Sequence, residues 1–142
     1  MANEEQDKNA IRELLATYCF HLDNYRFAEM AALFTEDGTW DTAFGPAKGR
    51  AKIEELVRRL SARNQPRPAM LHLTSNVIIE IAGDTATATS SWMVAQNSPR
   101  GPLLDCAGNY IDRLQKVGGQ WLFSYRKIDR YIAIDVKPEQ LA

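Results

Sequence analysis

Two glycine-containing turns divide the second half of the chain into long strand-like segments, and this pattern constrains the fold most. The segments are rich in β-branched and aromatic residues and cover residues 70–81, 85–96, 103–116 and 120–134. Gly83-Asp84 and Gly118-Gly119 provide tight turns, and a loop with Pro99, Gly101 and Pro102 separates the two middle segments. This half therefore predicts a meander of long antiparallel strands.

The first half has helical periodicity instead. Apolar residues recur at helical spacing in residues 7–23, 25–33 and 50–63, for example at Ile11, Leu14, Leu15, Tyr18 and Leu22. Between the second and third helices we expect a turn at residues 35–38 and a short strand at 39–44. The proline-bearing run at residues 64–68 ends the third helix.

Helices followed by antiparallel strands predict an α+β fold rather than an alternating β-α-β fold. The three N-terminal helices would cover one face of the sheet. Twist and bulges would curve that sheet into a cone whose open end is a natural place for a ligand pocket.

Composition excludes several classes of function. The chain has 142 residues, which suits a single domain over residues 1–142, and its net charge of −1 argues against general nucleic-acid binding. No apolar run reaches the roughly 18 residues of a membrane span, and the polar N-terminus does not read as a secretory signal. Cys19 and Cys106 lack metal-like spacing, and no phosphate-binding glycine loop is present. We therefore expect a cytoplasmic protein without cofactor, metal, membrane or nucleic-acid partners.

One of the two histidines, His72, lies near the start of a strand between apolar residues. Imidazole exchanges protons near neutral pH, so His72 could act as a base, and Asp23 at the end of the first helix could orient it. The alternatives are a partly buried histidine bonded to a backbone carbonyl, and an aspartate that is solvated or caps the next helix. From the residues alone, an Asp23 that is solvated or caps the next helix is favoured over a catalytic Asp23.

Residues 10–15, Tyr18, Asp23 and 34–38, together with 72–76 and 119–126, resemble the SnoaL-like branch of the nuclear-transport-factor-2-like (NTF2-like) superfamily. Within that branch the chain is most similar to scytalone dehydratases and hexachlorocyclohexane dehydrochlorinases. This resemblance implies an NTF2-like cone and a catalytic Asp–His dyad at Asp23 and His72. It also implies a homo-oligomer, with a trimer ahead of a dimer.

The resemblance also implies substrate-binding roles for Tyr18, Asn109 and Arg126. Trp92 could wall the same pocket. For each residue a structural role stays open: a core tyrosine, a core tryptophan, a solvent-facing asparagine, or an arginine paired with Asp112 or Asp129. Thr42 stands near the place of a tyrosine that scytalone dehydratases use, so scytalone itself is not the expected substrate.

Taken together, these features predict a cofactor-independent lyase that removes a proton beside an activating group and expels water or halide from a small cyclic or aromatic-like substrate. An isomerase or a polyketide-type cyclase with the same dyad is the enzymatic alternative. A non-catalytic small-molecule-binding module is the third possibility, because this fold also serves as a scaffold for interactions.

Overall fold

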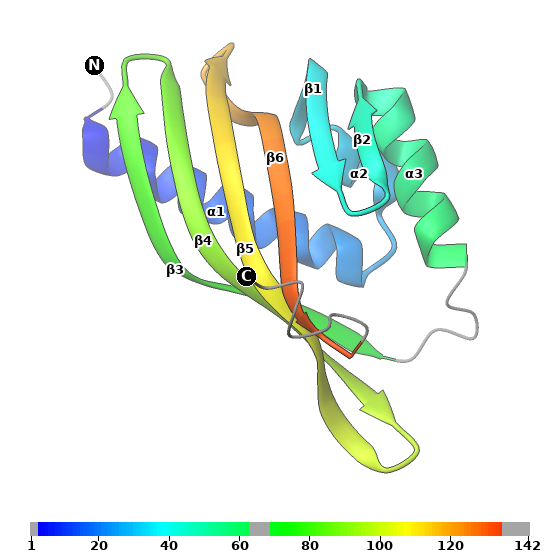
Figure 1. Cartoon of the computed structure of the whole chain (residues 1–142). Coiled ribbons are helices and arrows are strands. Elements are labelled where there is room, and N and C mark those ends of the chain that lie inside the picture. Colours follow the sequence, from blue (N-terminus) through cyan, green and yellow to red (C-terminus); the bar gives the residue numbers. More distant parts are fainter. Residues whose placement is uncertain (1–2, 63–68, 135–142) are drawn as a thin grey trace.

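The computed structural model describes residues 3–62 and 69–134. Helices α1, α2 and α3 lie on one side of a strongly curved sheet, and α1 runs across the concave face behind the long strands (Figure 1). This is the α+β architecture that the sequence predicts. The proline-bearing run expected at residues 64–68 lies outside the described residues.

The helices agree with the predicted ranges apart from their ends: α1 (Glu4–Asp23), α2 (Phe27–Ala31) and α3 (Arg50–Ala62). α1 starts earlier than predicted because the side chain of Asn3 caps it, accepting a hydrogen bond from the backbone N–H of Gln6 at 2.8 Å. Its buried face includes Ile11, Leu15 and Tyr18, as the periodicity predicts.

The sheet has six strands in the order β2-β1-β6-β5-β4-β3. Their bounds are β1 (Phe34–Thr42), β2 (Gly45–Lys48), β3 (Met70–Ala82), β4 (Thr85–Ser98), β5 (Gly101–Val117) and β6 (Gln120–Ala133). All neighbouring strands are antiparallel except β1 and β6, which are parallel. The hairpin of β4 and β5 projects beyond the other strands (Figure 1).

Two predictions for this sheet are wrong. Residues 35–38 form part of β1 rather than a free turn. The register of β1 against β6 shifts between Phe34 and Thr39, where the sequence contains the expected turn residues. The predicted loop between the two middle strands is also too long, because β5 already begins at Gly101. Pairing with a neighbouring strand overrides local turn preference in both places.

Gly108 in β5 allows a close backbone approach that shapes the sheet beside the cavity. A Cβ atom at this position would lie 1.8 Å from the carbonyl oxygen of Asp129, across a register shift between β5 and β6. The same carbonyl accepts a hydrogen bond from the indole N–H of Trp92 at 3.2 Å. Only glycine leaves room for this contact.

Hydrogen bonds from two side chains of the β5–β6 hairpin hold the start of α1 in place. The Asp7 carboxylate accepts hydrogen bonds from the Trp121 indole at 2.9 Å and from the Lys116 ammonium at 3.1 Å. These two donors, Trp121 first, lower the pKa of Asp7.

No helix in residues 3–62 and 69–134 is long and apolar enough to cross a membrane.

We predict that Gly108→Ala destabilises the protein by about 3 kcal/mol or more, because the new methyl group must displace the Asp129 backbone. Urea denaturation followed by circular dichroism measures the change. In variant protein that still folds, the displaced carbonyl should also shift the indole ¹⁵N–¹H signal of Trp92. A wild-type unfolding midpoint would contradict the close approach.

Candidate active site

The end of α1 and the start of β3 meet at Asp23 and His72. The Nδ1 atom of His72 lies 2.6 Å from Oδ1 of Asp23. The backbone N–H of His72 also donates to the carboxylate, at 3.0 Å to Oδ2 and 3.2 Å to Oδ1. Both side chains are largely buried, with 17% of His72 and 10% of Asp23 exposed. The structure therefore brings together the two residues that the sequence predicts as a dyad.

The contact to Asp23 decides the tautomer of the imidazole. A carboxylate only accepts hydrogen bonds, so Nδ1 carries the proton in this contact. The Nε2 atom then has a free lone pair, and it has no hydrogen-bond partner among residues 3–62 and 69–134. This arrangement prepares His72 to take a proton from a neighbouring molecule.

His72 lines a cavity of about 320 Å³ between the helices and the concave face of the sheet. Most of the wall is apolar and much of it is aromatic, including Tyr18, Trp40, Trp92 and Tyr110. The rings of Trp92 and Tyr110 are stacked, with centroids 5.7 Å apart. Such a wall suits a flat or cyclic apolar molecule with few polar groups.

Tyr18 points into this cavity from α1. Its hydroxyl oxygen accepts a hydrogen bond from the Trp40 indole at 3.0 Å. Burial raises the pKa of Tyr18 to about 12, although the Arg126 charge and the Trp40 hydrogen bond oppose the rise. Tyr18 therefore keeps its proton at neutral pH.

Arg126 is fully buried but does not line the cavity. Its Nε and Nη2 atoms donate to Asp112 at 2.8 and 2.9 Å, and its guanidinium lies 3.7 Å from the Tyr110 ring centroid and 4.3 Å from that of Tyr18. Burial alone would lower the pKa of Arg126, but the Asp112 charge and hydrogen bonds raise it above its ordinary value. Of the alternatives left open by the sequence, the structure shows the pairing with Asp112.

Asn109 lies outside the cavity. Its neighbour Tyr110 lines the cavity, and alternation along β5 turns Asn109 to the convex face. There its side-chain amide donates to the Ser90 carbonyl at 3.2 Å, and its oxygen accepts from the Tyr131 hydroxyl at 2.6 Å.

Two charged residues of the cavity, Asp105 and Arg130, are missing from the sequence prediction. Arg126, Ile128 and Arg130 alternate along β6, so the strand period could have identified Arg130 as sharing a face with Arg126. Asp105 lies at a register shift between β4 and β5, which simple alternation does not reveal.

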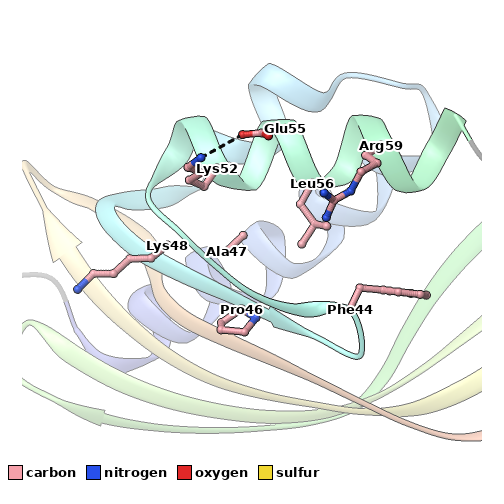
Figure 2. A pocket seen from close by; sticks show the side chains of 8 residues that line it. All are labelled: Phe44, Pro46, Ala47, Lys48, Lys52, Glu55, Leu56 and Arg59. Carbon is pink, nitrogen blue, oxygen red and sulfur yellow. Dashed lines mark hydrogen bonds and ion pairs between the residues drawn. The ribbon is translucent and has the colours of Figure 1, made fainter.

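Two further hollows flank this region. A groove of about 490 Å³ runs between α1 and β3, and both Asp23 and His72 border it. Figure 2 shows the other hollow, between β2 and α3, where Lys52 and Glu55 pair with each other at 3.4 Å. This second hollow contains no histidine. Within residues 3–62 and 69–134, no three histidine, cysteine, aspartate or glutamate side chains gather as metal ligands would.

Residues 3–127 match the model of the SnoaL-like domain. Among solved structures, a protein of unknown function from Mycobacterium tuberculosis is 31% identical, with a TM-score of 0.79 over 87% of this chain and 71% of that chain. A candidate scytalone dehydratase from Novosphingobium aromaticivorans is 24% identical, with a TM-score of 0.74 over 92% of this chain and 88% of that chain. An NTF2-like protein with a cystatin-like fold from the same organism is 22% identical, with a TM-score of 0.80 over 99% and 96%. The search among curated proteins found no match.

We predict that Asp112→Asn lowers the free energy of unfolding by about 3–5 kcal/mol, because it leaves the buried Arg126 charge uncompensated. Urea denaturation measures the loss. Asp129→Asn is the matched control, since Asp129 pairs with Lys127 at 3.4 Å on the surface and its loss should cost less than about 1 kcal/mol. Equal effects of the two substitutions would contradict the importance of the buried pair.

Proposed function

The chain belongs to the SnoaL-like family of the NTF2-like superfamily, and we propose that within it the protein is a cofactor-independent lyase of the dehydratase or dehydrohalogenase type. The observation that carries the proposal is the 2.6 Å contact between His72 Nδ1 and Asp23, beside a largely aromatic cavity. The family includes dehydratases and polyketide cyclases, which supports an enzymatic role.

In the proposed reaction His72 is the base. Nδ1 faces Asp23, so Nε2 lies on the opposite side of the ring and takes a proton from a carbon atom of the substrate. The electron pair of the broken C–H bond forms a C=C bond, and the neighbouring carbon releases halide, or a hydroxyl group that takes up the proton from the imidazolium and leaves as water. Asp23 stabilises the imidazolium that forms.

The cavity supports a small cyclic or aromatic-like substrate. Trp92 and Tyr110 offer a flat stacked wall, and Tyr18 offers a hydroxyl group. Arg126 would act indirectly, by holding the ring of Tyr18. Arg130 takes the place that the sequence prediction gave to Arg126 as the cation facing substrate.

An isomerase or cyclase could use the same base, because proton removal is common to all three reactions. Elimination differs by releasing water or halide. Product analysis by mass spectrometry therefore separates it from isomerisation, which leaves the mass unchanged.

We predict that His72→Gln reduces turnover by about 10²–10⁴-fold, because no base then faces the substrate. Asp23→Asn should be comparably severe, since the amide favours the wrong tautomer, and the serine-protease precedent is about 10⁴-fold. The assay screens hydroxylated and halogenated cyclic compounds for elimination with purified protein.

The matched control for both variants is His21→Gln. His21 is the other histidine of the chain and lies in the same last turn of α1 as Asp23. This variant should retain wild-type turnover. A substrate that His72→Gln converts at the wild-type rate would exclude this mechanism, and ligand binding without turnover would favour the binding module.

We also propose that the protein is a homo-oligomer, a trimer or a dimer. Apolar side chains on the convex face of the sheet are substantially exposed, including Leu71 (58%), Leu73 (48%), Met93 (42%) and Ile111 (40%). Leu73 and Met93 are paired across β3 and β4, so they form a continuous surface. A contiguous apolar surface of this kind is typical of an interface.

We predict that Leu73→Glu dissociates the oligomer, because it buries a charge in the proposed interface. Sedimentation equilibrium at micromolar concentration gives the mass of each species. Phe44→Glu, at an exposed apolar residue between β1 and β2 and so at the opposite edge of the sheet from β3, is the control and should keep the wild-type mass. A monomeric wild-type protein would contradict the proposal.

A further inference from the structure

The hollow between β2 and α3 has no part in the proposed reaction, but its charge is unusual for this chain (Figure 2). Its volume is about 390 Å³. Three of the residues that line it are cationic, Lys48, Lys52 and Arg59, and only Glu55 is acidic. The hollow is therefore positively charged, although the whole chain has a net charge of −1.

The pairing of these charges leaves Arg59 free. Glu55 lies four residues before Arg59, which is the helical spacing at which a glutamate and an arginine stabilise each other. Glu55 pairs with Lys52 instead, at 3.4 Å. Within residues 3–62 and 69–134, the Arg59 guanidinium has no hydrogen-bond or ion-pair partner. Its N–H donors are therefore available to an anion.

An apolar surface lies beside this arginine. Leu56 and Ala47 are 5% and 6% exposed, and both line the hollow. Phe44, which follows β1, is 58% exposed and lines the hollow as well. Figure 2 shows Arg59 and Phe44 at the same end of the hollow, with Lys48 at the other end. A free cation beside an exposed aromatic ring suits a ligand that has both an anionic group and a ring of its own.

We propose that this hollow is a second ligand site, which binds a small aromatic carboxylate. The carboxylate accepts hydrogen bonds from Arg59, and the aromatic ring of the ligand packs against Phe44 and Leu56. A guanidinium can donate two parallel hydrogen bonds to one carboxylate, which fixes the orientation of the ligand. The single charge of a carboxylate also matches one free arginine better than a phosphate ester, which carries nearly two charges. Binding at this site does not depend on the lyase function proposed above.

Phe44 connects this hollow with the cavity of the candidate active site, because it lines both. The two spaces also share α3, since Leu56 and Arg59 line the hollow and Val57 lines the cavity. A ligand packed against Phe44 would therefore contact a ring that borders the space for the proposed substrate. The cavity itself contains a cation, Arg130, and is the alternative location for an aromatic anion.

The test uses 2-naphthoate and 2-naphthamide as probes. The two molecules have the same ring system, but only 2-naphthoate is negatively charged at neutral pH. Titration followed by ¹H–¹⁵N NMR gives both affinities, and the Arg59 Nε–H signal and nuclear Overhauser effects to the Phe44 ring locate the ligand. We expect wild-type protein to prefer 2-naphthoate by about 2- to 5-fold, the range of an exposed ion pair, and added salt to reduce this preference.

Two substitutions separate the two halves of the site. Arg59→Gln should remove the preference for 2-naphthoate and leave the affinity for 2-naphthamide almost unchanged. Phe44→Leu should weaken the binding of both probes alike, because it removes the ring contact and keeps the charge. Both residues are exposed, so both variants should fold.

Arg58→Gln is the matched control. Arg58 precedes Arg59 on α3, but it pairs with Glu54 at 3.2 Å and does not line the hollow. This variant should keep the wild-type affinity for both probes. Arg130→Gln is the second control, because it removes the cation of the cavity, and it should also keep the preference for 2-naphthoate.

Four results would overturn the proposal. The first is equal affinity of wild-type protein for the two probes, and the second is a preference that survives Arg59→Gln. The third is a preference that depends on Arg130, which would place the anion in the cavity. The fourth is acetate that shifts the Arg59 signal at the same concentrations as 2-naphthoate, because the ring would then contribute nothing. None of these measurements involves turnover, so they leave the proposed reaction to its own test.

Discussion

The position of the Asp23 carboxylate is the constraint on which the site depends. Asp23 is the last residue of α1, where the helix dipole disfavours a negative charge. Hydrogen bonds from the backbone and the ring of one residue, His72, compensate for this. The same carboxylate therefore attaches α1 to the edge strand β3 and selects the imidazole tautomer. In the proposed mechanism, Asp23 therefore has both a structural and a chemical role.

The buried ion pair of Arg126 and Asp112 provides a second fixed point below the cavity. Aromatic rings surround the guanidinium, and its Nη1 atom has no hydrogen-bond partner among the described residues. An apolar cluster of the same volume could be equally stable, so stability alone does not explain a buried charge here. Its contact with the Tyr18 ring offers a reason, because Tyr18 lines the cavity.

Much of this fold could be predicted because its signals are local. Helical periodicity located α1 and α3, and glycine turns located the long hairpins. The sequence prediction omits β2 and places a turn at residues 35–38. It does so because the strand character of β1 comes from parallel pairing with β6, far away in the sequence. At the site, family resemblance paired Asp23 with His72, which local chemistry did not favour. The prediction for Asn109 depended on which face of β5 it occupies. Arg126 shares a face of β6 with Arg130, but its pairing with Asp112 among aromatic rings keeps it out of the cavity, and sequence alone does not reveal that pairing.

α1 joins the parts of the proposed machinery, since it carries both Tyr18 and Asp23. Asp7 holds its first turn to β5 and β6, and Asp23 holds its end to β3. With the helix held at both ends, a shift of α1 would displace Asp23 and Tyr18 together. Much of the remaining wall, including Trp92 and Tyr110, comes from the strands. Strand substitutions could therefore reshape the space for substrate while the relation between Asp23, His72 and Tyr18 is kept, which is how one scaffold can serve several reactions.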